Sequence, residues 1–144
     1  MMNTMALRDL ASALNSAIHG GSLTADGVAI ERVNTDTRSI RSGDLFVALK
    51  GERFDAHDFL ATAHQAGAFA AVVERVDERV AIPQLLVQDS TRALGDIAHL
   101  QRLQYQGPLV ALTGSCGKTT VKEMIAAVLQ QKGPVHVTRG NLNN

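Results

Sequence analysis

The stretch that most constrains the fold of this chain is Leu109-Val-Ala-Leu-Thr-Gly-Ser-Cys-Gly-Lys-Thr-Thr-Val-Lys-Glu-Met124. An apolar run of strand length comes first, a glycine turn follows, and a segment with helical apolar spacing begins near Lys118. A buried strand that passes through a glycine turn into a helix is typical of α/β folds with a parallel sheet. Because the N–H groups at the start of such a helix point at the turn, we predict that the turn binds an anion.

The residues of this turn have the chemistry to bind a nucleotide phosphate. Gly114 and Gly117 let the backbone turn tightly and bring its N–H groups close to an anion. The ammonium of Lys118 can reach the β- and γ-phosphates, and the hydroxyl of Thr119 is placed to ligate Mg²⁺. We therefore predict Lys118 as a catalytic residue and Thr119 as a metal ligand. The full set of predicted nucleotide-binding residues is Gly114, Ser115, Cys116, Gly117, Lys118, Thr119 and Thr120.

The turn departs from the strict phosphate-loop pattern at one position. Leu112 stands where the pattern G-x-x-x-x-G-K-[ST] has its first glycine. The structural alternative is a glycine turn that binds nothing. It leaves a lysine and two threonines at the first helical positions unexplained, because threonine is a mediocre helix former. A nucleophilic role for Cys116 is a second, minor alternative.

The composition narrows the class of protein. The 14 Lys and Arg residues balance the 14 Asp and Glu residues, so no overall positive field favours nucleic acid as a partner. The single cysteine excludes an internal disulfide and fits a reducing compartment. No apolar run approaches the ~18 residues of a membrane span. We expect a soluble, cytoplasmic protein without a membrane span.

Apolar runs and helical stripes alternate along the chain and predict two α/β domains. We expect helices over 7–18, 56–66, 91–105 and from residue 118 onward, and strands over 28–33, 44–49, 68–73, 84–88, 109–113 and 134–138. The charged segment 74–79 and Pro83 favour a boundary between a domain of residues 1–82 and a domain of residues 83–144. Since a parallel sheet usually has neighbours on both sides of each strand, three strands make the second domain incomplete. We therefore expect the chain to be the front part of a longer protein.

Three stretches together resemble the Mur ligases, which are ATP-dependent amide-forming enzymes of peptidoglycan synthesis. They are Thr35 to Phe59, Thr113 to Met124 and Gly140 to Asn144. The Mur phosphate loop also lacks the glycine that Leu112 replaces here. Within the family, Val121-Lys-Glu-Met124 and Gly140-Asn-Leu-Asn-Asn144 are most similar to the member that adds D-alanyl-D-alanine to UDP-N-acetylmuramoyl tripeptide.

The resemblance implies a reaction, and it implies which domain binds each substrate. In the family, ATP and Mg²⁺ serve to phosphorylate the terminal carboxylate of the UDP-linked substrate, and the incoming amine attacks the acyl phosphate. The N-terminal domain of residues 1–82 would bind the UDP substrate, and the domain that starts at residue 83 would bind ATP. The resemblance also implies that these 144 residues alone are inactive, because further active-site residues follow in the family.

The resemblance further implies which residues bind the UDP-linked substrate. The matching positions are Thr35, Thr37, Arg38, Glu52, Arg53 and Phe54, with Asn141 and Asn144 near the family's sugar-peptide and second-metal contacts. Hydroxyl and guanidinium groups can bind uracil and pyrophosphate oxygens, and the Phe54 ring can stack on a planar group. The alternative for Thr35 to Arg38 is a strand end capped by an Asx turn. For Asp55, His57 and Asp58 we favour a helix N-cap cluster over a metal site.

Two other functions remain open at this point. One is another ligase that uses the same loop, similar to folylpolyglutamate or cyanophycin synthetase, although those enzymes lack the segment 44–59 as it stands here. The other is a nucleotide-binding module without catalysis. Binding of a UDP-linked substrate would distinguish the ligase of peptidoglycan synthesis from the non-catalytic nucleotide-binding module.

Overall fold

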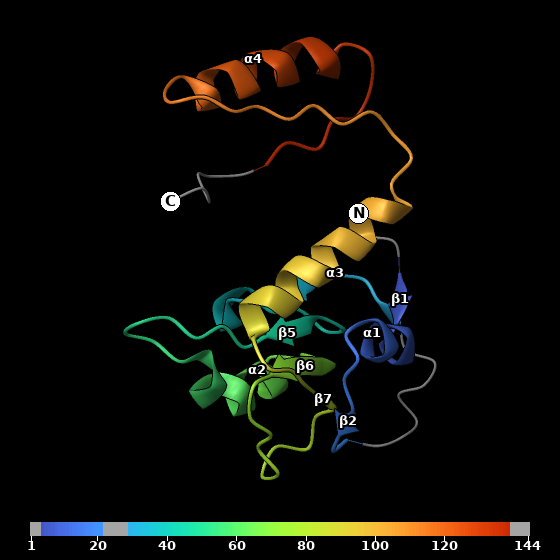
Figure 1. Ribbon diagram of the computed structural model, residues 1–144, viewed down its shortest axis with the longest axis vertical. Coiled ribbons are helices and arrows are strands. Elements are labelled where there is room, and N and C mark those ends of the chain that lie inside the picture. The colour runs from blue at the N-terminus through green and yellow to red at the C-terminus, as the bar shows by residue number, and fades with distance from the viewer. Residues whose placement is uncertain (1–3, 22–28, 139–144) are drawn as a thin grey trace. The chain divides into compact units, whose positions relative to one another are not determined.

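The computed structural model describes residues 4–21 and 29–138 of the chain (Figure 1). The chain divides into two compact units, residues 1–106 and residues 107–144. The expected boundary between residues 82 and 83 is therefore wrong. Strand β7 (Gln84–Leu86) pairs with β6 (Ala70–Val73), and helix α3 (Ser90–Gln104) packs on the core of the first unit, so both elements belong to that unit.

The first unit is built on a five-stranded sheet with the order β2-β7-β6-β5-β4. Its remaining strands are β2 (Ile18–His19), β4 (Val33–Asn34) and β5 (Leu45–Val47). Strands β4, β5, β6 and β7 are parallel, and β2 is an antiparallel edge strand. A second, two-stranded antiparallel sheet pairs β1 (Met5–Ala6) with β3 (Ala29–Ile30). The predicted α/β class is confirmed, whereas the single strand expected over 28–33 is two short strands in different sheets.

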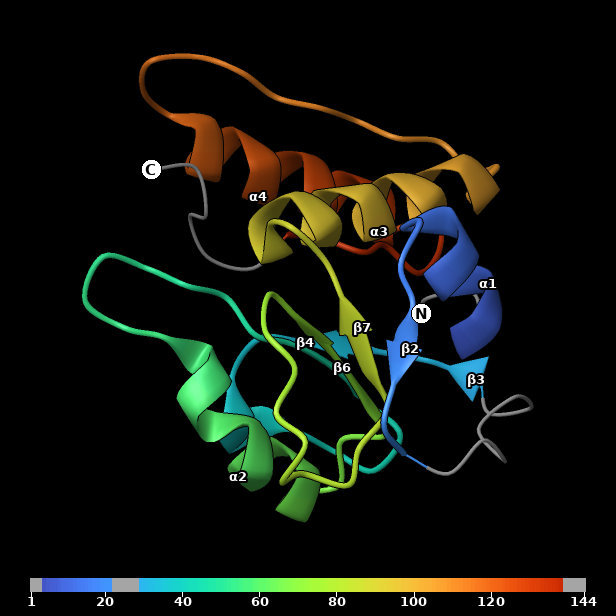
Figure 2. The ribbon, with the colours of Figure 1, turned by 60° about the horizontal axis from the view of Figure 1, so that its bottom comes forward.

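Helices cover both faces of the five-stranded sheet, as Figure 2 shows. Helix α1 (Leu7–Ala13) and α3 share one hydrophobic cluster with the sheet. The 3-10 helix η3 (Ala56–Phe59) and the following α2 (Leu60–Gln65) share the other. The helix expected over 56–66 is thereby confirmed, with its first turn in the tighter 3-10 form.

Strands β5 and β6 bury the side chains of both their faces. Leu45 and Val47 belong to the cluster under α1 and α3, whereas Phe46 between them belongs to the cluster under α2. The same alternation sends Ala70 and Val72 of β6 to the first cluster and Ala71 and Val73 to the second. This explains why the sequence of both strands is continuously apolar instead of alternating with polar residues. No polar side chain of these two strands is available for chemistry, so functional groups must come from the loops.

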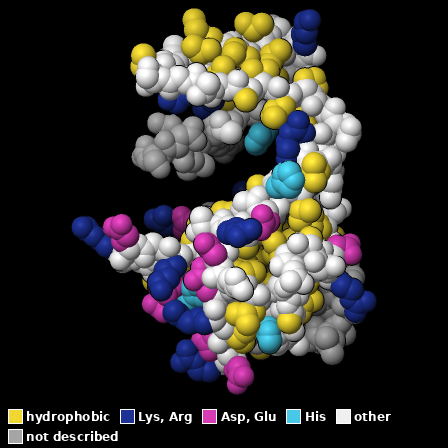
Figure 3. Space-filling view, in the orientation of Figure 1, with side chains coloured by type: hydrophobic (Ala, Val, Ile, Leu, Met, Phe, Trp, Pro, Cys, Tyr) yellow, Lys and Arg dark blue, Asp and Glu magenta, His cyan; other side chains and the backbone are white. Residues whose placement is uncertain are grey.

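The second unit contains the helix predicted after the glycine turn, α4 (Lys118–Gln130). The strands predicted over 109–113 and 134–138 are not formed, because neither segment pairs with a strand among the described residues. The predicted apolar face of α4 is present but uncovered, and Figure 3 shows hydrophobic side chains gathered on the surface of this helix. Met124 and Val128 are 64% and 69% exposed. Among the described residues of α4 only Ala126 is buried. Within residues 4–21 and 29–138, no helix is both long and apolar enough to cross a bilayer.

Candidate functional site

The glycine turn predicted to bind phosphate lies directly before α4. Gly117 is the N-cap of the helix and has a left-handed backbone with φ of +75°, a conformation that a side chain would strain. The helix therefore starts at Lys118, the position that the sequence pattern assigns to the phosphate-binding lysine. This local geometry turns the first N–H groups of α4 and those of the preceding residues into one exposed stretch of donors.

The donors of the turn are free to bind an anion. Among the described residues, no protein acceptor receives a hydrogen bond from the N–H groups of Ser115, Cys116 or Gly117. The ammonium of Lys118 donates to the carbonyl oxygen of Gly114 at 2.5 Å, so it folds back over the turn instead of pairing with a carboxylate. Unpaired amides and a cation above them fit the phosphates of a nucleotide.

A metal ion at this turn would depend on hydroxyl ligands. Thr119 and Thr120 are exposed in the first turn of α4, next to Lys118. The described part of the chain contains no group of three or more His, Cys, Asp or Glu side chains that could hold a metal. Threonine hydroxyls can ligate a Mg²⁺ ion that phosphate oxygens also bind, and Thr119 has the exposed hydroxyl that this arrangement would use.

The segment Thr35 to Arg38 is a turn at the carboxyl end of β4. Asp36 caps the 3-10 helix η2 (Thr37–Ser39), because its carboxylate accepts from the Arg38 N–H at 3.0 Å. The same carboxylate accepts from the Arg38 guanidinium through Nε at 2.9 Å and Nη2 at 2.7 Å. The Arg38 side chain lowers the pKa of Asp36 to about 2. The capped turn that we weighed as the structural alternative is thus present, and it leaves the Nη1 side of the Arg38 guanidinium outside the bonds to Asp36.

The residues Glu52, Arg53 and Phe54 form the exposed tip of a hairpin after β5. The hairpin closes through a bridge between Lys50 and Asp55, and the Gly51 N–H donates to the Phe54 carbonyl at 2.8 Å. Phe54 is 56% exposed, and its ring stacks on Phe59 with the centroids 5.3 Å apart and the planes 20° apart. Phe59 was not predicted as a site residue. Its aromatic ring at the start of a helix, five residues after Phe54, is the signal that could have indicated it.

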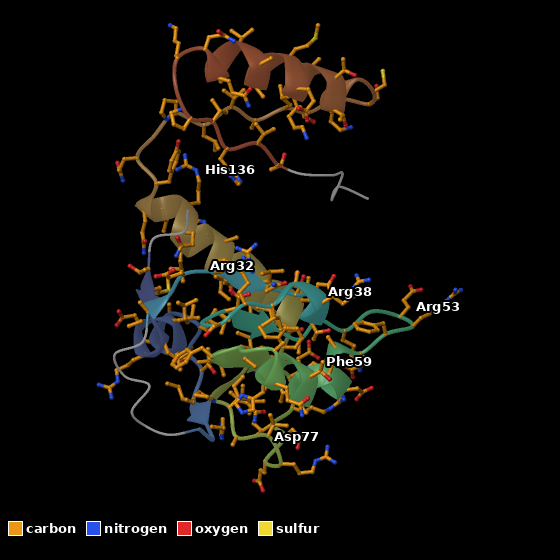
Figure 4. The ribbon with its side chains drawn as sticks, turned by 180° about the vertical axis from the view of Figure 1, so that it is seen from behind. Arg32, Arg38, Arg53, Phe59, Asp77 and His136 are labelled. Atoms are coloured by element: carbon orange, nitrogen blue, oxygen red, sulfur yellow. The ribbon has the colours of Figure 1, made fainter. Side chains whose placement is uncertain are left out.

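Parallel strands bring these two loops to one edge of the sheet. Strands β4 and β5 are neighbours, so the turn 35–39 and the hairpin 50–55 both leave the sheet at its carboxyl edge. Figure 4 shows Arg38, Arg53 and Phe59 on the same side of the first unit. Ligands of open α/β sheets bind at this edge. The arrangement therefore places a guanidinium, hydroxyl groups and an aromatic ring at the same edge of the sheet. Asn141 and Asn144, also predicted as substrate contacts, lie outside the described residues.

Asp55, His57 and Asp58 form the helix-capping cluster that we favoured over a metal site. Asp55 caps η3 by accepting from the His57 N–H at 3.0 Å, and it accepts from Nδ1 of the buried His57 ring at 2.5 Å. The Nε2 atom of that ring accepts from the Glu74 N–H at 2.8 Å. Arg75 donates to both Asp55 and Asp58, at 2.7 and 2.9 Å. These bonds hold the loops after β5 and β6 together at the carboxyl edge.

The cluster around Asp55 makes the free energy of unfolding depend on pH. Hydrogen bonds from the His57 backbone and ring and from Arg75 hold the pKa of Asp55 well below its usual range. A carboxyl whose pKa is lowered by folding stabilises the protein above its unfolded pKa of about 3.9, and that stabilisation disappears as the pH falls. We expect Asp55→Asn to lower the free energy of unfolding at pH 7. The difference in free energy of unfolding between the variant and the unaltered chain should become smaller below about pH 4. Urea unfolding at pH 7, 5 and 3 measures this, and a gap that widens in acid would contradict it.

Comparison with known proteins places these observations in one family. The family model described as Mur ligase family, catalytic domain, matches residues 29–102, and the model described as Mur ligase middle domain matches residues 112–144. The division between the compact units, after residue 106, lies in the interval between the two matched ranges.

Individual relatives agree with the family models. The UDP-N-acetylmuramoyl-tripeptide–D-alanyl-D-alanine ligase of Escherichia coli (strain K12) is 48% identical over 99% of this chain and 30% of its own length. The ligase of the same name from Synechocystis is 44% identical over 100% of this chain and 32% of its own length. The chain therefore spans about 30% of the curated relatives that it matches.

Solved structures give the same result. A crystal structure of MurF from Acinetobacter baumannii matches with a TM-score of 0.85 and 42% identity, over 99% of this chain and 31% of the other. The MurF ligase from Thermotoga maritima, whose structure is a complex with ADP, matches with a TM-score of 0.68 and 39% identity, over 78% of this chain and 26% of the other. Since the first family model alone covers more than half of the sequence, this chain belongs to the Mur ligase family.

Proposed function

We propose that this chain supplies the UDP-substrate site and the ATP-binding loop of an ATP-dependent ligase that adds D-alanyl-D-alanine to UDP-N-acetylmuramoyl tripeptide through an acyl phosphate. The observation that carries the proposal is the exposed turn before α4. Its N–H groups at residues 115–117 have no protein acceptor in the described part of the chain, and its lysine donates to the Gly114 carbonyl of the same turn. The identity of 48% to a ligase with this activity supports the choice of substrates within the family.

In this proposal the second unit binds and orients the ATP phosphates. Bound ATP supplies the phosphoryl group that activates the substrate carboxylate. The N–H groups of residues 114–117 and the hydroxyl of Thr120 bind phosphate oxygens, and Thr119 ligates Mg²⁺. Lys118 leaves the Gly114 carbonyl and neutralises charge on the phosphoryl group as it is transferred.

The first unit binds the UDP end of the other substrate at the carboxyl edge of its sheet. Arg38 suits a pyrophosphate, because the face of its guanidinium away from Asp36 can donate to phosphate oxygens. The exposed ring of Phe54 suits the planar uracil base, with Glu52 and Arg53 on the same hairpin. The hydroxyls of Thr35 and Thr37 are the remaining polar groups of the turn. Asn141 and Asn144 stay in the proposal as contacts to the sugar-peptide part. A cytoplasmic location, where the single cysteine stays reduced, completes it.

Separate titrations of the 144-residue chain with ATP and with UDP-N-acetylmuramoyl tripeptide test the two halves of the proposal. Hydrogen bonds to charged groups contribute about 1.5–3 kcal/mol, so loss of one should weaken binding about tenfold or more. We expect Lys118→Ala to weaken binding of ATP alone and Arg38→Ala to weaken binding of the UDP precursor alone. A chain that binds ATP but not the precursor would instead be a phosphate-binding module, and the ligase assignment would fail.

The single cysteine provides a direct probe of the ATP loop. Cys116 is exposed in the middle of the turn. Because a nucleotide bound to the neighbouring amides would cover the thiol, we expect Mg-ATP to slow alkylation of Cys116 by iodoacetamide. Mass spectrometry of timed samples measures the rate, and Mg-AMP serves as the control because it lacks the β- and γ-phosphates. Equal labelling rates with and without Mg-ATP would count against a nucleotide at this turn.

A further inference from the structure

A buried carboxylate accepts hydrogen bonds from residues on both sides of the turn that is proposed to bind the UDP end of the substrate. Asp44, the residue directly before β5, is only 2% exposed. Its Oδ2 atom accepts from Arg32 Nη2 at 2.8 Å, from the Arg41 N–H at 2.9 Å and from Asn34 Nδ2 at 3.3 Å. These donors lie before and after the segment 35–40. One carboxylate oxygen therefore fixes both ends of the segment that contains Thr35, Thr37 and Arg38.

The Asn34 side chain connects Asp44 to the interior of the turn. Its Nδ2 donates to Asp44, while its Oδ1 accepts from the Asp36 N–H at 3.0 Å and from the Ser39 hydroxyl at 3.1 Å. A carboxylate can only accept and a backbone N–H can only donate, so these partners fix the orientation of the amide. A side chain with a donor at one end and an acceptor at the other is required here, and asparagine is the short residue that has both.

The connection continues to the guanidinium that would meet the ligand. The backbone of Asp36 is held by Asn34, and its carboxylate holds Arg38 through Nε and Nη2. Arg32 adds a second support, because its Nη2 also donates to the Ser39 carbonyl at 3.2 Å. Asp44, Asn34, Asp36 and Arg38 thus form a continuous series of hydrogen bonds from the core to the exposed edge of the sheet.

We propose that Asn34 and Asp44 are positioning residues, which hold the Thr35–Arg38 turn in the conformation that binds the diphosphate of a uridine nucleotide. This inference rests on the proposed function, since it concerns the same site. Neither residue needs to touch the ligand. Their effect is to fix the backbone of Asp36 and, through it, the direction of the Arg38 side chain.

Calorimetric titration of the 144-residue chain with UDP tests this inference. Asn34→Asp keeps the size of the side chain and its acceptor for the Asp36 N–H, but it replaces the donor with a second carboxylate facing Asp44. Asn34→Ala removes both bonds. We expect each variant to bind UDP at least tenfold more weakly while its ATP affinity stays unchanged. Hydrogen exchange of the Asp36 amide, which loses its acceptor, should be faster in Asn34→Ala.

Gln84 provides a matched control for general loss of stability. Its side chain is 1% exposed, and its amide also connects a loop to the sheet, accepting from the Asp77 N–H at 2.9 Å and donating to the Asp77 carbonyl at 2.8 Å. Gln84 begins β7 and so lies at the amino edge, opposite to the Thr35–Arg38 turn. We expect Gln84→Ala to lower the melting temperature without weakening UDP binding.

The outcomes separate this inference from the proposed function. If the unaltered chain binds UDP and both Asn34 variants bind it within twofold of that affinity, the inference is overturned and the proposed function stands. If Gln84→Ala weakens UDP binding as much as the Asn34 variants do, the effect is general destabilisation and the inference is again overturned. If the unaltered chain binds no UDP, both fail. Should Asn34→Ala not fold, as judged by circular dichroism, the isosteric Asn34→Asp decides.

Discussion

Replacing Lys118 with alanine should lower kcat of the proposed ligase by about 10²–10³-fold, the usual loss when one charge-stabilising donor is removed from an active site. Within residues 4–21 and 29–138, the ammonium donates to the Gly114 carbonyl oxygen and pairs with no carboxylate that would compete with a phosphate. Because its charge acts on the phosphoryl group during transfer, kcat should fall more than the KM for ATP rises. Steady-state assays of phosphate release with saturating substrates measure both quantities.

Lys132 is a suitable control for the loss of charge. It is exposed just after the other end of α4, and Lys132→Ala changes the net charge of the unit by the same amount. We expect that variant to keep kcat within about twofold, because surface charges away from a site have small effects. Near-normal turnover of Lys118→Ala, or an equal loss in both variants, would remove Lys118 from its proposed role.

The second large effect concerns stability. Phe46→Ala should lower the free energy of unfolding of the chain by about 3–5 kcal/mol. Phe46 is fully buried in the middle of β5, and it is the largest such side chain in the described part of the chain. Several of its neighbours in the cluster under α2 are alanines, among them Ala63 and Ala71, which are too small to fill the space that the ring would leave. Urea unfolding followed by far-UV circular dichroism gives the value.

Phe54→Ala is the matched control, since it deletes the same atoms from an exposed position. Phe54 is 56% exposed and loses mainly its stacking on Phe59, so we expect a cost of about 1 kcal/mol or less. The difference between the two variants then reports burial alone. Similar losses in both would mean that the cluster around Phe46 is not the packed core that the structure describes.

Much of the first unit could be predicted from residue patterns, because its central strands are buried on both faces. A strand covered by helices on each side must be apolar throughout, and the runs at 44–49, 68–73 and 84–88 have this property. The boundary could not be predicted in the same way. The charged segment 74–79 has the composition of a linker, yet Arg75 pairs with Asp55 and Asp58, and Arg79 pairs with Asp77. Composition does not reveal that charges pair with one another inside a unit.

The candidate site also has parts that could be predicted from the sequence and parts that could not. The glycine turn could be predicted because its residues are consecutive and their spacing is characteristic, and the loop after β5 could be predicted from the family resemblance. The support behind the Thr35–Arg38 turn could not, because Asn34 and Asp44 are ten residues apart and meet only through the pairing of β4 with β5. The prediction of strands at 109–113 and 134–138 was wrong for a related reason. Apolar sequence favours a strand, but a strand also requires a partner to accept its backbone hydrogen bonds.

The double burial of β5 and β6 also determines where this protein can change. Any polar replacement in those seven positions would enter one hydrophobic cluster or the other, and natural or laboratory variation there should be confined to apolar residues of similar volume. Variation at Thr35, at Arg38 and over 50–54 meets no such restriction from the core, because these positions are exposed to solvent. A randomised library aimed at a different ligand would therefore retain folded members if it altered these positions and left β5 and β6 untouched.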